Sequence, residues 1–252
     1  MALIHCDFYS EVLGFSTSML VVLPRQSGPE IRGRCHPVLY LLHGLSDDHT
    51  VWLRQTAVER YAVSRGLAVV MPNVHRSFYT NMVAGHDYWT FISEELTDLA
   101  RGFFPLAAER EHNFVAGLSM GGYGALKLAL RHPEKFAAAA SLSGAVDVAG
   151  MFHERGEEWR QELARIFGSE DRVAGSEDDL FHLAETVPGS ARRKPGIYLC
   201  CGLSDGLLEE NRRFRTHLRR MKFRLTYREG PGGHNWDYWD TMIQRVVRWL
   251  PL

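Results

Sequence analysis

The sequence predicts an α/β fold, with a mostly parallel central sheet that carries helices on both faces. Three observations predict it. Short apolar runs alternate with helix-like segments along most of the chain, a pattern typical of parallel strands joined by crossover helices. A glycine-rich strand-to-helix turn lies near the middle of the chain, around Ser119. The length of 252 residues is also enough to bury a full core.

The expected strands begin with an antiparallel hairpin that turns near Gly14. In chain order the expected strands are Phe8–Val12, Thr17–Leu23, Val38–Leu42, Ala68–Met71, Asn113–Ala116, Ala137–Leu142, Ile197–Cys201 and Arg224–Arg228. The expected helices are Trp52–Ser64, Tyr88–Phe103, Met120–Arg131, Leu207–Met221 and Trp236–Trp249. Because the pattern continues without a linker or repeat, we expect a single domain over residues 1–252.

Residues 150–194 fit no element of the core. Their charged pieces, Glu154 to Phe167 and Glu177 to Glu185, predict helices inserted over the site, which would form a small helical cap. A simple surface excursion is the alternative interpretation.

Composition excludes several classes of partner. The net charge of −1 argues against nucleic acid and anionic membranes. No apolar run reaches spanning length, and the first residues lack the basic start and apolar centre of a signal peptide. The four cysteines show no metal-binding spacing, and the neighbouring Cys200 and Cys201 are expected to be reduced core residues on opposite faces of a strand. We therefore expect a cytoplasmic protein without a bound metal.

Two pentapeptides have the pattern Gly-x-Ser-x-Gly, Gly117–Gly121 and Gly202–Gly206. This pattern marks a nucleophile elbow only where a strand enters it and a helix leaves it. Ser119 meets both conditions, and the helix N-terminus behind it favours a developing negative charge. Ser204 comes late in the chain with an aspartate beside it. We therefore predict Ser119 as the nucleophile and the second pentapeptide as the loop that carries the acid.

A serine nucleophile needs a base and an orienting carboxylate, which follow it in the order acid and then histidine. Five of the twelve histidines follow Ser119, and His234 lies in the glycine-rich loop before the last helix. A loop of that kind can carry an imidazole over the sheet edge, so His234 is the predicted base. Asp205 and Asp147 both follow strands, and Asp205 is preferred because it follows the later one. Asp147 stays as the alternative, with helix capping as its ordinary role.

The remaining machinery is predicted from two loops. An oxyanion needs the N–H after the nucleophile, that of Met120, and a second N–H from the loop after the third strand. For the second donor we predict Leu45, with Gly44 in reserve, and His43 as a residue that braces the loop. Most aromatic residues near the site are expected in the core. Gly44, Tyr79 and Trp236 are the expected contacts with substrate.

Five stretches together resemble the esterase D family over nearly the whole chain. They are His43-Gly44-Leu45, Ser77-Phe78-Tyr79-Thr80-Asn81, Gly117 to Ala125, Leu203-Ser204-Asp205 and Gly233-His234-Asn235-Trp236-Asp237-Tyr238-Trp239. The match is closest to the bacterial tributyrin esterase (acetylesterase) branch. It implies an α/β-hydrolase fold, short-chain acyl ester substrates, the triad Ser119, Asp205 and His234, no cofactor, and often a homo-oligomer.

Two other functions compete with a serine carboxylesterase that takes acetyl to butyryl esters. One is a thioesterase or acyltransferase with the same triad, like the relative that hydrolyses S-formylglutathione. That relative has histidine where this chain has Leu118 in the elbow. The other is an inactive binding protein, against which a complete triad argues. A peptidase is disfavoured because no accessory domain restricts access to the site.

Overall fold

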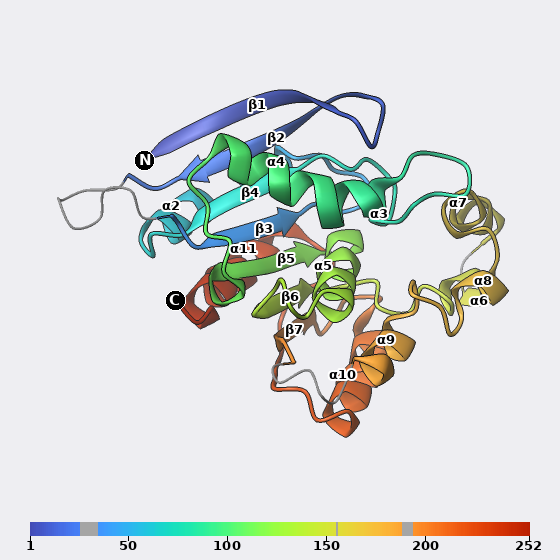
Figure 1. Cartoon of the computed structure of the whole chain (residues 1–252). Helices are drawn as coiled ribbons and strands as arrows, with labels where there is room; N and C mark the ends of the chain where they lie inside the picture. The colour runs from blue at the N-terminus through green and yellow to red at the C-terminus, as the bar shows by residue number, and fades with distance from the viewer. Residues whose placement is uncertain (26–34, 155, 188–193) are drawn as a thin grey trace.

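A single twisted sheet runs through the centre of the protein (Figure 1). The computed structural model describes residues 1–25, 35–154, 156–187 and 194–252. The strands are β1 (Ala2–Ser10), β2 (Phe15–Leu23), β3 (Val38–Leu42), β4 (Ala68–Pro72), β5 (Asn113–Leu118), β6 (Ala138–Leu142), β7 (Gly196–Gly202) and β8 (Leu225–Gly230). Their order across the sheet is β1-β2-β4-β3-β5-β6-β7-β8. Among the strands of the described residues, only the pairs β1/β2 and β2/β4 are antiparallel, so the prediction of a mostly parallel sheet is confirmed.

The central strands are buried on both faces. Every residue of β3 to β7 is buried, which is why these strands read as unbroken apolar runs and not as alternating patterns. Side chains still alternate between the two faces, since Tyr40 and Leu42 belong to one core cluster while Leu39 and Leu41 belong to the other. The sheet therefore separates two hydrophobic cores.

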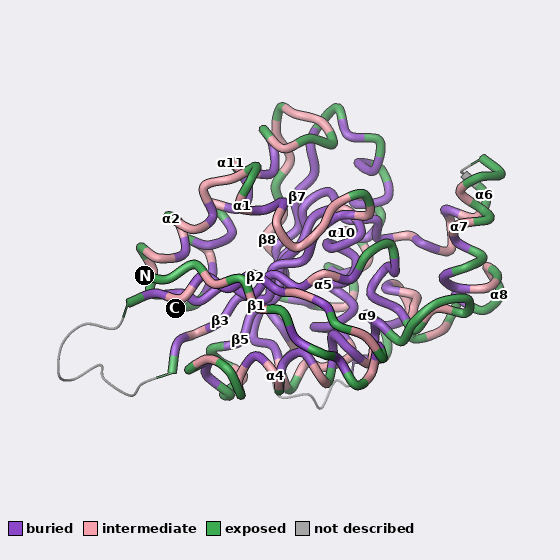
Figure 2. Tube along the Cα trace, turned by 90° about the horizontal axis from the view of Figure 1, so that it is seen from above, coloured by how far each residue is buried: buried purple, intermediate pink, exposed green. Residues whose placement is uncertain are grey.

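Helices cover both faces, as the sequence predicts. They are α1 (Val51–Gln55), α2 (Val58–Val63), α3 (Tyr88–Thr90), the π-helical turn Phe91–Glu95, α4 (Leu96–Phe103), the 3₁₀ turn Arg110–His112, α5 (Met120–Arg131), α6 (Met151–Glu154), α7 (Glu157–Phe167), α8 (Glu170–Val173), α9 (Leu180–Thr186), α10 (Leu208–Arg220) and α11 (Trp236–Trp249). Helices α1, α2 and α11 contribute to one core, while α4, α5, α9 and α10 contribute to the other. Figure 2 shows the buried positions concentrated on the strands and on α5.

Three expected elements differ in the structure. The helix expected over Trp52–Ser64 is two helices, because Thr56 is extended with φ −138° and ψ 167°. The helix expected over Tyr88–Phe103 contains the π-helical turn. Strand β1 begins at Ala2, six residues before the expected start, and pairs with β2 along its whole length. It is an edge strand with many exposed side chains, so its hydrophobic signal in the sequence is weak.

The segment between β6 and β7 carries α6 to α9. In Figure 1, α6, α7 and α8 lie beyond the carboxyl ends of the parallel strands, whereas α9 packs against α5 and α10. Helices α7 and α9 correspond to the two expected inserted helices, and residues 155 and 188–193 of the expected cap lie outside the described residues. Across the described ranges, no helix combines the length and apolar character needed to cross a bilayer.

Candidate active site

Ser119 stands at a sharp turn between β5 and α5. Its backbone has φ 52° and ψ −119°, a left-handed conformation that costs a non-glycine residue on the order of 1–3 kcal/mol. The turn leaves no room for side chains at the flanking glycines. A Cβ on Gly117 would lie 2.3 Å from the carbonyl oxygen of Gly121, and a Cβ on Gly121 would lie 2.4 Å from that of Leu42. The glycines of the first pentapeptide therefore allow the tight turn in which Ser119 adopts its strained backbone conformation.

The structure brings Ser119, His234 and Asp205 into one hydrogen-bonded relay. The hydroxyl oxygen of Ser119 lies 3.1 Å from Nε2 of His234. Nδ1 of His234 lies 3.0 Å from Oδ2 and 3.2 Å from Oδ1 of Asp205. The three residues follow β5, β8 and β7, whose carboxyl ends meet at one edge of the sheet. Distances of this size permit proton transfer from the hydroxyl to the imidazole.

The carboxylate of Asp205 is enclosed and held in its ionised form. Its side chain has no exposed surface, whereas that of His234 is 37% exposed. Burial works against the charge, but hydrogen bonds from His234, from the Leu207 N–H at 2.9 Å and from Ser143 outweigh it and hold the carboxyl pKa below its ordinary value. A buried, ionised carboxylate can fix the orientation of the imidazole and stabilise its protonated form.

Ser143 is a part of this arrangement that the sequence did not predict. It follows β6, and its backbone is left-handed, with φ 48°. Its hydroxyl accepts a hydrogen bond from Nε1 of Trp239 at 3.2 Å and bonds to Asp205. Trp239 in turn packs edge-on against the ring of His234, with 4.8 Å between ring centroids. The only sequence signal was a serine at the end of the strand that lies between β5 and β7.

The loop after β3 lies against the elbow. A Cβ on Gly44 would be 2.7 Å from Cδ1 of Leu118 and 3.8 Å from Cβ of Ser119. His43 braces this loop from below, as the sequence suggests. Its Nδ1–H donates to the carbonyl of Gly44 at 2.7 Å, and its Nε2 accepts from the N–H of Val74 at 3.1 Å. Burial lowers the pKa of His43 to about 4, so the ring is neutral and this pattern of one donor and one acceptor is stable.

Two hollows meet at Ser119. The smaller, of about 300 Å³, is lined by Leu45, Phe78, Ser119, Ala145, Met151, Trp159, Asp205, Gly206, Leu207 and His234. The other, of about 520 Å³, is more polar and is lined by Gly44, Leu45, Ser46, Asp47, Arg76, Leu118, Ser119, Trp159, His234, Asn235, Trp236 and Trp239. Gly44 and Trp236, the predicted contacts with substrate, thus line a hollow beside Ser119.

Comparison with known proteins identifies the family. Residues 10–250 match the model of the Esterase family, described as "Putative esterase". This chain belongs to the esterase family. It is 30% identical to the acetyl esterase of Caldicellulosiruptor saccharolyticus over 265 aligned residues, which cover 99% of this chain and 98% of that protein.

Two solved structures from Staphylococcus aureus are also similar over nearly their whole length. The fluorophosphonate-binding serine hydrolase FphF superposes with a TM-score of 0.91, and the S-formylglutathione hydrolase FrmB with 0.88. Each is 35% identical to this chain, with 99% of this chain and 98% of the other covered. With this esterase membership the α/β-hydrolase fold is confirmed, and the protein is a serine carboxylic ester hydrolase.

The structure corrects the expectation for Tyr79 in this esterase. Tyr79 is fully buried and lines neither hollow. Its hydroxyl donates to the carbonyl of His43 at 3.0 Å, beneath the loop that carries Gly44. The preceding residue, Phe78, lines the smaller hollow instead. Both residues have left-handed backbones, with φ 50° and 52°.

Asp147, the alternative acid, lies elsewhere. Its Oδ2 forms an ion pair with Arg213 at 2.8 Å, and its Oδ1 accepts from the N–H of Gly150 at 3.0 Å. These contacts tie Asp147 to the turn that precedes α6 and to α10, away from His234. Asp205 is the carboxylate that the structure places against His234.

Proposed function

We propose that this esterase hydrolyses short-chain acyl esters, from acetyl to butyryl, through an acyl-enzyme on Ser119. The observation that carries the proposal is the relay from Ser119 through His234 to the buried Asp205, with separations of 3.1 and 3.0 Å. His234 accepts the hydroxyl proton as Ser119 attacks the ester carbonyl, and then gives that proton to the departing alcohol. Asp205 holds the ring and stabilises the imidazolium during both steps.

The developing oxyanion would be bound by the N–H groups of Leu45 and Met120. Met120 opens α5, and the first N–H groups of a helix have no partner within it. Leu45 lines both hollows beside Ser119. Two N–H groups that converge near the nucleophile stabilise the tetrahedral intermediate and act again when water attacks the acyl-enzyme.

The size of the smaller hollow supports the short-chain assignment. Its volume of about 300 Å³ is at the lower end of ligand pockets. Phe78, Met151 and Trp159 supply an apolar wall that suits a small alkyl group. Met151 and Trp159 belong to residues 150–194, so we propose that this insertion is a cap that limits pocket depth. The similar protein from C. saccharolyticus is named an acetyl esterase.

A thioesterase acting on S-formylglutathione is the second candidate. It is favoured by the 35% identity to FrmB, which is named for that activity. The same serine, histidine and aspartate would serve both substrates, because a thioester carbonyl is attacked in the same way as an ester carbonyl.

A chain-length profile tests the proposal. We would measure kcat/KM for p-nitrophenyl acetate, butyrate, octanoate and dodecanoate, together with S-formylglutathione. Each methylene buried in an open pocket would add about 0.8 kcal/mol, which is roughly fourfold in kcat/KM. We expect a maximum between acetyl and butyryl and a marked fall by octanoyl, because further methylenes meet the wall of the pocket.

Met151→Ala provides the matched variant, since it removes part of that wall without touching the relay. Its optimum should move toward longer acyl chains. A profile that rises steadily to dodecanoyl in the wild type would contradict the short-chain proposal. Faster turnover of S-formylglutathione than of every oxygen ester would favour the thioesterase.

A further inference from the structure

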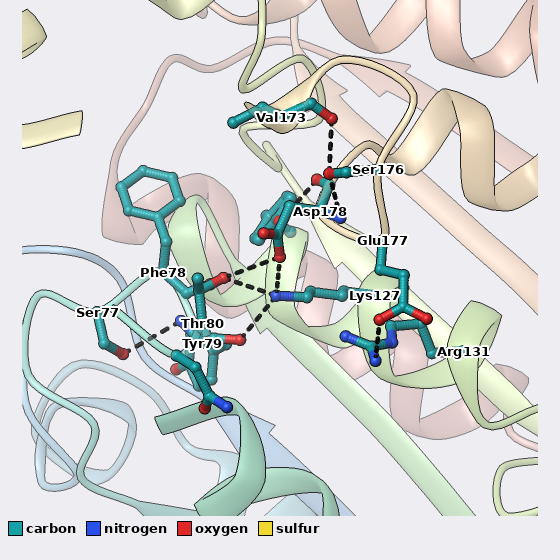
Figure 3. A network of polar contacts seen from close by, with 12 residues as sticks. Ser77, Phe78, Tyr79, Thr80, Lys127, Arg131, Val173, Ser176, Glu177 and Asp178 are labelled. Atoms are coloured by element: carbon teal, nitrogen blue, oxygen red, sulfur yellow. Dashed lines mark hydrogen bonds and ion pairs between the residues drawn. The ribbon is translucent and has the colours of Figure 1, made fainter. Parts of the chain in front are cut away.

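Lys127 is a buried cation in the helix that begins at the elbow. It lies two turns after Ser119 in α5, and its side chain is 1% exposed. Its ammonium lies 2.5 Å from Oδ1 of Asp178, 2.6 Å from the hydroxyl oxygen of Thr80 and 3.2 Å from the carbonyl oxygen of Tyr79 (Figure 3). An ammonium has three protons to donate. Every one of them has an acceptor here.

Stabilisation of the fold alone does not explain why a lysine is buried at this position. Burial lowers the pKa of Lys127 to about 8, against the opposing effect of Asp178, so the charge is held at a cost. The rings of Trp89 and Tyr123 flank it at 4.7 and 5.7 Å. Apolar residues in place of a buried ion pair are often as stable or more so. The Lys127 charge takes no part in the Ser119 relay. Its role therefore lies in the segments of the chain that it joins.

The ion pair joins three parts of the chain around the site. Lys127 belongs to α5, Asp178 to the insertion between α8 and α9, and Tyr79 and Thr80 to the loop after β4. Tyr123, also in α5, donates its hydroxyl proton to the carbonyl of Asp178 at 2.8 Å. The insertion is therefore fastened to the helix of the elbow at a buried point.

From that point a short path leads to the oxyanion loop. Lys127 donates to the carbonyl of Tyr79, and the hydroxyl of Tyr79 donates to the carbonyl of His43 at 3.0 Å. His43 immediately precedes Gly44 and bonds to its carbonyl. Phe78 and Tyr79 both have left-handed backbones, which persist only where surrounding contacts enforce them. The same segment thus sets the Phe78 wall of the smaller hollow and supports the loop from below.

We propose that Lys127 and Asp178 are positioning residues for ester hydrolysis. Their ion pair, in which the ammonium is buried and the carboxylate partly exposed, fixes the strained Phe78–Tyr79 segment and, through the Tyr79 hydroxyl, the Gly44–Leu45 loop. The inference rests on the proposed function and deepens it: the insertion sets the geometry of the oxyanion donors in addition to covering the acyl pocket.

A neighbouring ion pair provides a matched control. Arg131 lies one turn further along α5, and its Nη2 is 2.5 Å from Oε2 of Glu177, the residue before Asp178. This pair joins the same two elements, but its side chains are 20% and 74% exposed. In the described part of the chain neither side chain hydrogen-bonds to residues 77–80. Its loss should weaken the same connection without disturbing the Tyr79 segment.

The experiment compares Lys127→Met, Asp178→Asn and the Lys127→Met/Asp178→Asn double variant with Arg131→Met/Glu177→Gln. Four quantities are measured: Tm, kcat and KM for p-nitrophenyl acetate, and the rate at which a fluorophosphonate probe labels Ser119. The labelling reaction places a phosphonyl oxygen where the oxyanion would lie. It therefore reports the position of the donors whatever the natural ester is.

Each single variant should lose Tm. Asp178→Asn leaves the buried ammonium without its counter-charge, and Lys127→Met leaves a carboxylate unpaired that is 28% exposed. The double variant should regain most of that Tm while kcat and the labelling rate stay at least about tenfold below wild type, with KM changed by less than about threefold. Misplaced oxyanion donors weaken only interactions made in the transition state. The Arg131/Glu177 control should keep kcat, KM and the labelling rate within about twofold of wild type and change Tm only slightly.

Recovery of kcat and labelling together with Tm in the double variant would overturn the positioning role and leave a purely structural one. An equal loss in the Arg131/Glu177 control would also overturn it. Wild-type protein that the probe fails to label at Ser119 would instead remove the proposed function, and this inference with it.

Discussion

Replacing Asp205 by Asn is the sharpest test of the site, because it keeps the shape of the side chain and removes its charge. The carboxylate accepts from Nδ1 of His234 with both oxygens, at 3.0 and 3.2 Å, and from the N–H of Leu207 at 2.9 Å. An amide has one acceptor and one donor group. In the fully enclosed site, the amide nitrogen would face a group that also donates.

The histidine can resolve this conflict by moving its proton. If the Asn side chain donates to Nδ1 of His234, the ring must carry its proton on Nε2, which faces Ser119 at 3.1 Å. That nitrogen can then no longer accept the hydroxyl proton. The imidazolium also loses its counter-charge. In a serine protease the same change lowers kcat about 10⁴-fold, equivalent to roughly 5.5 kcal/mol, and we expect a loss of that order here.

Asp147→Asn is the matched control. Its ion pair with Arg213 is partly exposed, with side-chain exposures of 22% and 49%, and pairs of that kind contribute about 1 kcal/mol or less. We would measure kcat and KM with p-nitrophenyl acetate, and a thermal melt to show that each variant is folded. An Asp205→Asn enzyme that keeps more than about a tenth of wild-type kcat would refute the reasoning. An inactive but folded Asp147→Asn would move the acid to the loop after β6.

Three further outcomes are expected. Ser119→Ala should lower kcat by a factor on the order of 10⁶, whereas Ser204→Ala, at an exposed position, should leave kcat nearly unchanged. Steady-state rates of the two purified variants test this, and the reverse order of activities would contradict the elbow assignment. Gly121→Ala should lose both Tm and activity, because its Cβ would meet backbone oxygens at 2.4 and 2.6 Å. Gly102→Ala, at an exposed position of α4 with open space around it, should lose neither. Equal melting curves for the two variants would refute this. Hydrogen bonds hold the pKa of Asp205 below its ordinary value in spite of burial, so the ionised carboxylate stabilises the fold above the ordinary carboxyl range and this stabilisation is lost as the pH falls through the folded-state pKa. Thermal melts from about pH 7 to about pH 2 should therefore show the Tm advantage of wild type over Asp205→Asn disappearing. A constant difference in Tm would contradict the pKa shift.

The parts of the fold that the sequence predicts are those with local signals. The parallel strands are apolar runs because both faces of the sheet are covered, and the elbow is visible because Gly117 and Gly121 stand where a Cβ cannot fit. The order of acid and base along the chain then selects Asp205 and His234 from many candidates. In the structure, His234 lies against Ser119 and Asp205 lies against the far side of the His234 ring.

Ser143 and Tyr79 could not be placed in this way, since their positions depend on contacts between distant segments. Ser143 bonds to Trp239, 96 residues away, and its φ of 48° follows from no local motif. Tyr79 and the preceding Phe78 are consecutive residues with left-handed backbones. The room for the Tyr79 ring comes from Gly124, where a Cβ would lie 2.5 Å from the ring carbons. A sequence pattern identifies that glycine as part of a helix, but not as the residue that admits an aromatic ring.

The environment of Lys127 shows that the insertion between β6 and β7 affects residues outside its own helices. In the sequence it is a lysine in a helix, and such residues are ordinarily exposed. Here every residue of α5 from Met120 to Leu130 is buried, because α9 packs against one side of the helix and β5 and β6 against another. The burial of Lys127 thus depends on the segment that supplies Asp178. Without that segment, the cation and the carbonyl of Tyr79 that it binds would meet water, and the strained turn beside the pocket would lose the contact that holds it. The segment between β6 and β7 therefore helps to hold the loops around the active site. A substitution in that segment that breaks the contact with Lys127 should lower the rate of reaction at Ser119.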